Sequence, residues 1–253
     1  MFCERPNGLF PCGKCRACRL RKANEKMIIS IFAANEFKAK GQFITLTYND
    51  EHLPKNGLQH SDFSDFMKRL RRNTGVKYLK MFMAGEYGET YGREHFHALF
   101  YNHKFPIEEI EKAWRDPVTH EPIGFVEDGT CTPQAMKYVS GYVNKKGYDP
   151  GSGKRPPYGR SSCNLPDNLS CLEIVKMCKT GKISYNGRNF SVPRNWRRRY
   201  ESIWKYFARE RDQYQLDNHD FDKKELTPSQ VSAIMDMRDR YLAHKRRRKK
   251  KCL

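Results

Sequence analysis

At the centre of the sequence stands Glu94-His95-Phe96-His97-Ala98-Leu99-Phe100-Tyr101, an apolar run that contains two histidines. Side chains alternate between the two faces of a β-strand, so His95 and His97 point to one side and Phe96 to the other. Two imidazoles on one face form a preset pair of metal ligands. The stretch therefore predicts a strand that is anchored in a core and carries a candidate metal site.

The charge of the whole chain indicates an anionic partner. Its 253 residues, enough for one sizeable domain or two small ones, carry a formal net charge of +19. Such a field attracts polyanions, of which nucleic acid is the commonest. We see no apolar run long enough to cross a bilayer and no signal-peptide pattern before the first cysteines, so we expect a soluble intracellular protein.

The nine cysteines, an odd number, suggest thiols or metal ligands rather than a disulfide framework. Cys12, Cys15 and Cys18 follow one another at intervals of three and resemble half of a zinc knuckle. The fourth ligand stays open between Cys3, Cys163, Cys171 and Cys178. Alternatively, the three thiols are simply reduced and share one face of a helix start.

Two further strands are expected before the histidines. Residues 42–48 alternate, with Ile44, Leu46 and Tyr48 on one face and Phe43, Thr45 and Thr47 on the other. Residues 77–84 form the second, joined to residues 95–101 by a tight glycine-containing loop. Glu86, placed at the end of that strand across the turn from the histidines, is the favoured third ligand, with Glu89 and Glu94 as alternatives. Mixed N and O ligands with open positions suit Mg²⁺ or Mn²⁺ on a phosphate oxygen.

A helix beginning at Thr132-Pro133 and ending at Gly147 carries two tyrosines on one face, Tyr138 and Tyr142. A tyrosinate is a competent nucleophile when a base or a metal assists it. Lys145, on the same side, can stabilise a phenolate or the charge of a phosphate. The plainer interpretation is that both tyrosines lie at the edge of a core.

The remaining segments predict accessory structure. Residues 149–166 are expected to form a long loop, and residues 172–178 a helix that stops at Gly181. Asn186-Gly187 predicts a hairpin between residues 182–185 and 188–191. After Pro193 a single basic, aromatic helix is expected to pack on the domain. Thr227-Pro228 starts a last helix that runs into a basic, solvated tail with non-specific affinity for phosphate.

Three motifs in order resemble those of the HUH endonucleases that initiate rolling-circle replication: residues 43–48, His95-Phe96-His97, and Tyr138 through Tyr142 to Lys145-Lys146. The cysteine-rich start, residues 46–54 and Gly85-Glu86-Tyr87-Gly88 are similar to the replication initiator of gokushovirus-like microviruses, which are small single-stranded DNA bacteriophages. The match covers roughly residues 12–146 and extends more weakly to Pro193.

The resemblance implies an α+β fold with a central antiparallel sheet and packed helices, an HUH endonuclease core of RRM-like type. A Cys-rich N-terminal segment precedes this core, and a helical, basic part follows it. We expect four parts: a Cys-rich basic segment and helix at 1–35, the HUH core at 36–150, an extension of loop, hairpin and helix at 151–215, and a C-terminal helix with the basic tail at 216–253.

The resemblance also implies the reaction. A metal held by His95, His97 and Glu86 polarises the scissile phosphate, and a tyrosine attacks it, leaving a 5′-phosphotyrosine bond and a free 3′-hydroxyl. A second tyrosine later cleaves the regenerated origin, and the circle closes. Tyr142, which has the Tyr-x-x-Lys spacing of single-tyrosine relatives, is narrowly favoured to act first. DNA contacts are expected from a basic and hydroxylic set: Arg16, Arg19, Thr45, Thr47, Arg93 and Lys146.

The chain has no G-x-x-x-x-G-K-[ST] phosphate loop, so unwinding is expected to need a host helicase, with a host polymerase, in the cytoplasm of an infected bacterium. Two alternatives stay open. One is a non-catalytic, zinc-containing protein that binds or packages single-stranded DNA, which gives no reason for the histidines and tyrosines to occur together. The other is a related HUH transposase or relaxase.

Overall fold

The computed structural model describes residues 3–5, 10–13, 15–38, 41–88, 91–142 and 153–217. Helices and strands are mixed along these residues, which confirms the α+β class. In chain order they are α1 (Arg16–Glu36), β1 (Gln42–Thr47), α2 (His60–Thr74), β2 (Met81–Tyr87), β3 (Glu94–Phe100), α3 (Ile107–Ala113), β4 (Val126–Thr130), α4 (Pro133–Tyr142), β5 (Tyr158–Ser161), α5 (Cys171–Thr180), β6 (Lys182–Tyr185), β7 (Arg188–Ser191), α6 (Arg194–Arg199), α7 (Glu201–Tyr206) and α8 (Ala208–Asp217).

The main sheet is antiparallel throughout and has the strand order β4-β1-β3-β2-β5. The histidine strand β3 is therefore its middle strand, with both edges of β3 hydrogen-bonded. Register places Glu86 of β2 opposite His95, and Thr45 of β1 opposite His97. Neighbouring strands lie about 4.8 Å apart, so these side chains meet on one face of the sheet.

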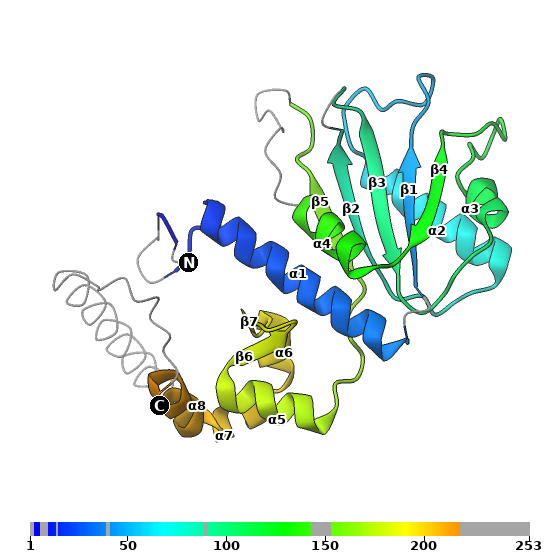
Figure 1. Ribbon diagram of the computed structural model, residues 1–253. Coiled ribbons are helices and arrows are strands. Elements are labelled where there is room, and N and C mark those ends of the chain that lie inside the picture. Colours follow the sequence, from blue (N-terminus) through cyan, green and yellow to red (C-terminus); the bar gives the residue numbers. More distant parts are fainter. Residues whose placement is uncertain are drawn as a thin grey trace, which may run out of the picture.

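The two faces of the sheet are covered by different helices, as Figure 1 shows: α2 and α3 lie behind the strands, and α4 with α1 in front. Phe96, Ala98 and Phe100 of β3 point toward α2 and α3 and are fully buried. The α2 residues that meet them follow the helical spacing of the sequence: Phe63, Phe66, Met67 and Leu70. The remaining β3 residues, including both histidines, point to the face of α1 and α4, because strand side chains alternate.

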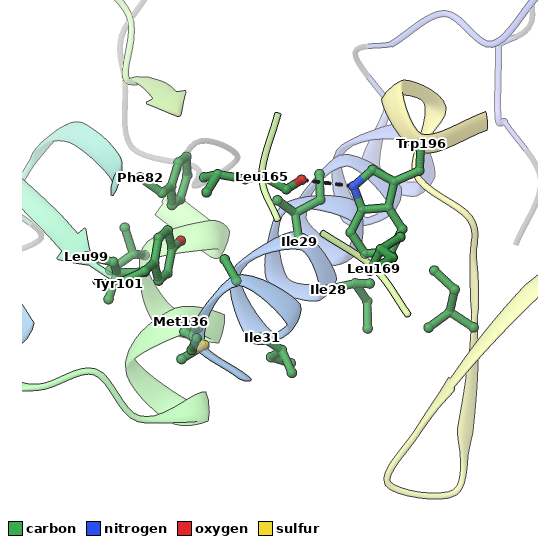
Figure 2. Packing of buried hydrophobic residues seen from close by; sticks show 14 of the residues in the cluster. Ile28, Ile29, Ile31, Phe82, Leu99, Tyr101, Met136, Leu165, Leu169 and Trp196 are labelled. Atoms are coloured by element: carbon green, nitrogen blue, oxygen red, sulfur yellow. Dashed lines mark hydrogen bonds between the residues drawn. The ribbon is translucent and has the colours of Figure 1, made fainter. Parts of the chain in front are cut away.

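Helix α1 is shared by the sheet and the C-terminal part of the described chain. Figure 2 shows its isoleucines Ile28, Ile29 and Ile31 between sheet residues on one side and Leu165, Leu169 and Trp196 on the other. The indole Nε1 of Trp196 donates to the carbonyl of Leu165 at 2.9 Å, which satisfies a buried polar group. Both sides of α1 thus bury apolar surface, and one core joins the sheet to the hairpin β6–β7 and its helices.

The structure corrects three local predictions. Strand β2 begins at Met81 and ends at Tyr87, three residues later than predicted, so Glu86 and Gly85 lie inside the strand. The segment predicted as a loop at 149–166 contains β5, which pairs with the edge of β2. The aromatic helix after Pro193 is divided at Tyr200 and Phe207 into α6, α7 and α8, although Trp196 is buried as expected. Strand pairing and helix breaks of this kind depend on tertiary contacts rather than on local pattern.

Other predictions agree with the structure or lie outside it. The hairpin turns at Asn186 and Gly187, both with positive φ, between β6 and β7 as predicted. Helix α5 ends at Gly181 in the left-handed conformation that favours glycine. The end of the tyrosine helix beyond Tyr142, and the last helix with the basic tail, lie outside the described residues. Within the described ranges, every helix is too short or too polar to span a bilayer.

Candidate metal and nucleophile site

Three side chains converge on the α4 face of the sheet: Glu86 of β2 and His95 and His97 of β3. One carboxylate oxygen, Glu86 Oε1, lies 2.8 Å from His95 Nε2 and 3.1 Å from His97 Nε2. The three ligand atoms all lie within 4.8 Å of one another, so the group could hold a metal ion. The antiparallel register explains the meeting, since Glu86 is directly opposite His95 and His97 is the next residue on the same face.

The far nitrogen of each imidazole is held by a partner. The carbonyl of Arg93 lies 3.1 Å from His95 Nδ1, and Thr45 Oγ1 lies 3.0 Å from His97 Nδ1. When Nδ1 carries the proton, the lone pair of each Nε2 faces the carboxylate oxygen of Glu86. Three electron-pair donors then point at one position, and a cation between them relieves their mutual repulsion.

Burial and hydrogen bonding tune this group. Glu86 is only 3% exposed, and burial alone would raise its pKa, but hydrogen bonds from His95 and His97 lower the pKa below its ordinary value. Burial lowers the pKa of His97, which favours the neutral imidazole that binds metals. The second oxygen, Glu86 Oε2, is buried without a hydrogen-bond partner among the described residues. An orphaned carboxylate oxygen beside two ligand nitrogens fits a divalent cation.

One of the two predicted nucleophiles lies beside this group. The ring of Tyr138 on α4 stands edge-on to the ring of His97, with 5.5 Å between centroids, and Tyr138 is 51% exposed. On the other side Phe43 stacks on His97 at 5.5 Å. Tyr142 is the last residue of α4, one helical turn further on, and its side chain is outside the described part, as are Lys145 and Lys146.

The alternative third ligands do not join the group. Glu94 is buried on the opposite side of β3, where Lys154 Nζ lies 2.8 Å from its Oε1. Glu89 lies outside the described residues. Sequence reasoning missed two neighbours of His97, namely the hydrogen bond of Thr45 and the stacked ring of Phe43. Their placement on the face of residues 43–47 opposite to Ile44 was the available signal.

Three of the residues expected to contact DNA have internal partners. Thr45 bonds His97, and Thr47 Oγ1 donates to the carbonyl of Phe125 at 3.1 Å. Arg93 bonds Asp50 Oδ1 at 2.5 Å and the carbonyl of Tyr48 at 3.0 Å. Arg16 is exposed and Arg19 half-buried at the start of α1. Their contacts with DNA therefore stay predictions, and Thr45 and Arg93 have positioning contacts that the sequence did not reveal.

The structure gathers four cysteines at the N-terminus: Cys3, Cys12, Cys15 and Cys18. Their sulfur atoms lie within 4.8 Å of one another, so this second group could also hold a metal ion. The other three candidates for the fourth position lie elsewhere. Cys163 and Cys171 are exposed, and Cys178 is buried in the core under α5.

Comparison with known proteins gives a consistent result. Residues 41–147 match the model of the replication-associated protein ORF2 family. The chain is 36% identical to the replication-associated protein VP4 of Bdellovibrio phage phiMH2K over 156 residues, which cover 54% of this chain and 48% of the relative. It is 28% identical to the replication-associated protein ORF4 of Chlamydia phage 1, over 73% of this chain and 52% of the relative.

A third relative is the replication-associated protein ORF2 of Spiroplasma virus 4, 30% identical over 55% of this chain and 49% of the relative. The chain thus spans about half the length of the curated relatives it matches. No solved structure matches it. The matched region contains β1, β2, β3 and α4, and with them both parts of the candidate site. The resemblance inferred from the motifs is thereby confirmed, and the chain is a relative of the replication-associated proteins of small phages, with an ORF2-family region at residues 41–147.

Proposed function

We propose that the chain initiates replication by nicking single-stranded origin DNA through attack of a tyrosine on a phosphodiester. The observation that carries the proposal is the convergence of Glu86, His95 and His97 on one point with the ring of Tyr138 beside His97. The similarity to phage replication-associated proteins supports a role in replication. The net charge of +19 supports binding to a polyanion.

Glu86, His95 and His97 would hold a divalent cation, which we propose is Mg²⁺ or Mn²⁺. When bound, that ion supplies Lewis-acid polarisation of a phosphate oxygen at the scissile bond. The protein residues around it keep the ligands in place. Thr45 and the carbonyl of Arg93 fix the two imidazole rings, and the buried position of Glu86 keeps water away from the carboxylate.

The covalent step balances without a nucleotide cofactor. The phenolic oxygen of a tyrosine forms a bond to phosphorus as the bond from phosphorus to the 3′-oxygen breaks. The phenol loses its proton, the 3′-oxygen leaves as a hydroxyl, and the 5′-phosphate stays on the tyrosine. The energy of the phosphodiester bond is conserved in this link, so reversal of the step rejoins strands. We propose that the second tyrosine performs the later transfer that closes the circle.

The order of the two tyrosines is a matter for experiment. The Tyr-x-x-Lys spacing favours Tyr142 for the first cleavage, with Lys145 stabilising charge. The contact with His97 favours Tyr138, whose hydroxyl-bearing ring lies beside the candidate metal group. Both residues lie on α4, four positions apart, so each can serve one face of the site.

The test is a cleavage assay on single-stranded DNA that contains the origin, with Mn²⁺ or Mg²⁺ and with neither. We expect a covalent adduct, seen by denaturing gel and by intact mass, that requires metal and maps to Tyr138 or Tyr142. The variants Tyr138→Phe and Tyr142→Phe assign the first nucleophile, and Tyr91→Phe, at an exposed residue, is the matched control. Tight DNA binding without any adduct, across several origins and both metals, would instead support a non-catalytic binding or packaging protein.

The remaining parts of the proposal concern the setting. Origin DNA is the substrate, and a host helicase and polymerase supply unwinding and synthesis in the cytoplasm of the infected bacterium. The absence of a nucleotide-binding phosphate loop from the sequence supports a separate helicase. A related transposase or relaxase would share the chemistry but would transfer strands between different DNA ends, which the same assay distinguishes with two labelled substrates.

A further inference from the structure

The four N-terminal thiols form a compact group that the nicking reaction does not use. Cys12 and Cys15 lead into α1, Cys18 lies in its first turn, and Cys3 comes from a segment earlier in the chain. The sulfur atoms of Cys3 and Cys15 are 3.8 Å apart, and all four lie within 4.8 Å of one another. Among the described cysteines none forms a disulfide.

These spacings fit one tetrahedral zinc ion. A tetrahedral Zn²⁺ with Zn–S bonds of about 2.3 Å separates its sulfur ligands by about 3.8 Å. A disulfide would require about 2.05 Å between two sulfurs. An iron–sulfur cluster also uses four thiolates, but its several irons hold them further apart.

The surroundings favour thiolates. The backbone N–H of Cys12 donates to Cys3 Sγ, and that of Cys15 donates to Cys12 Sγ, both at 3.2 Å. Arg21 Nη2 lies 3.8 Å from Cys18 Sγ. Four thiolates and a zinc ion carry a net charge of −2, and the group lies at the N-terminus of α1, whose first turn has no acidic residue. A helix N-terminus stabilises negative charge, and so do the cations of this segment.

We propose that Cys3, Cys12, Cys15 and Cys18 bind one structural zinc ion, which ties the N-terminal segment to the start of α1. The segment has little apolar packing of its own, since Phe10 is 66% exposed and the buried apolar residues nearby are Ala17 and Cys18. In segments with so small a core, metal binding supplies the free energy of folding.

The test is the metal content of the purified chain by mass spectrometry, with a matched pair of double variants. We expect one zinc per chain in the native protein, its loss in Cys12→Ser/Cys15→Ser, and its retention in Cys163→Ser/Cys171→Ser, at two exposed cysteines outside the group. His95→Ala/His97→Ala should retain this zinc, which separates it from any metal at the histidines.

Cobalt substitution of the chain with all cysteines present gives a second readout that does not depend on folding of a variant. We expect the ligand-field and thiolate charge-transfer bands of tetrahedral Co²⁺ in the native chain and in His95→Ala/His97→Ala. Iron with visible absorption, zinc unaffected by Cys12→Ser/Cys15→Ser, or four reactive thiols without metal would overturn the proposal.

A separate observation concerns a groove of about 720 Å³ between α1, the exposed Lys137 of α4 and the β6–β7 hairpin. Its lining holds three cations, Arg21, Lys137 and Arg188, and one carboxylate, Glu25. Burial holds the pKa of Glu25 above its ordinary value despite the nearby Arg197 and Arg21, which makes its negative charge easier to neutralise.

The groove also contains two half-buried aromatic rings, Tyr185 and Phe190 of the hairpin. Cations that track phosphates and aromatic rings on which bases stack are the combination by which proteins bind single-stranded nucleic acid. Lys137 directly precedes Tyr138, whose ring touches the candidate metal group, so a strand held at that group can continue along α4 into the groove.

We infer that this groove binds the single-stranded DNA that flanks the scissile phosphate; the inference rests on the proposed nicking function. Anisotropy of a fluorescein-labelled single strand tests it as a function of salt. Lys137→Glu/Arg188→Glu should weaken binding at least about tenfold and reduce the slope of log affinity against log salt, by about 0.7 for each phosphate that the variant no longer neutralises. Arg72→Glu/Lys104→Glu makes the same charge change at exposed residues outside the groove and should have a much smaller effect.

Photo-crosslinking of 5-iodouracil placed beside the cleavage position supplies a second readout, with crosslinks expected at Tyr185 or Phe190. Equal affinity and slope in the two double variants, together with crosslinks elsewhere, would overturn the groove. If crosslinks map to the hairpin but no adduct ever forms on a tyrosine, the groove stands and the nicking function fails. If nicking proceeds while Lys137→Glu/Arg188→Glu binds like its control, the opposite holds.

Discussion

Tyr138 of α4 and His97 of β3 lie with their rings edge-on, 5.5 Å apart between centroids, although 41 positions separate them along the chain. Helix α4 packs across the face of the sheet on which both histidines point. A candidate nucleophile is therefore within reach of the candidate metal group without any rearrangement of the backbone. Changes at this face can be tested by separating metal binding, cleavage and stability.

Glu86→Gln removes the charge of the buried carboxylate while keeping its size. Metal affinity depends on the number of charged ligands, so we expect the Mn²⁺ concentration for half-maximal nicking to rise at least about tenfold. Glu121→Gln, at an exposed residue in a turn, is the control. Calorimetric titration of Mn²⁺ measures the affinity independently of cleavage. Unchanged Mn²⁺ affinity in Glu86→Gln would exclude this carboxylate as a ligand.

Thr45→Val removes the hydroxyl that bonds His97 Nδ1 but preserves the shape of the side chain. Loss of such a supporting partner costs about 10–100-fold in metal affinity. Thr45→Ser keeps the hydroxyl and should restore affinity to nearly the native value. If Thr45→Val and Thr45→Ser bind Mn²⁺ equally well, the hydroxyl has no positioning role.

Gly124→Ala tests a close backbone approach beside β1. A Cβ at this position would lie 2.0 Å from the carbonyl oxygen of Thr47, which is backbone and cannot move aside easily. We expect a loss of about 1–3 kcal/mol in the free energy of unfolding, measured with urea. Gly141→Ala, inside α4, meets no atom within 4 Å and should be neutral or stabilise by about 0.5–1 kcal/mol. Equal stability of the two variants would contradict this packing.

Asp167→Asn tests an ion-pair network that ties the chain after β5 to the start of β2. Asp167 accepts from Tyr78 and Lys80, and although burial would raise its pKa, these hydrogen bonds lower it below the ordinary value of 3.8. A depressed carboxyl pKa stabilises the fold above that ordinary pKa, and the contribution disappears as pH falls through the folded pKa.

We therefore expect Asp167→Asn to lower the free energy of unfolding by about 1 kcal/mol near pH 6 and by much less near pH 2. Urea unfolding at several pH values measures the difference between native and variant chains. A difference that stays constant from pH 6 to pH 2 would show that the carboxylate charge is not what stabilises this contact.

Elements with strong local patterns were predictable from the sequence. The alternation in β1 and in β3, the helical spacing of Phe63, Phe66, Met67 and Leu70, and the Asn186-Gly187 turn each depend on residues close together in the chain. Strand β5 was not, because its four residues show no alternation and pair with β2 only through the tertiary fold. The end of β2 was misplaced for the same reason, since pairing with β3 extends it through Glu86.

The amino-acid pattern alone fixed which residues carry chemistry and which face of a strand or helix they share. It placed His95 and His97 together, Tyr138 and Tyr142 together, and Cys12, Cys15 and Cys18 together, because periodicity within one element is local. Folding of the whole chain settled how these sets meet. It placed Glu86 opposite His95, Tyr138 against His97, and Cys3 beside the other three thiols. Sheet register and helix packing bring together residues that are distant in sequence, and these depend on burial of the shared core rather than on any local pattern.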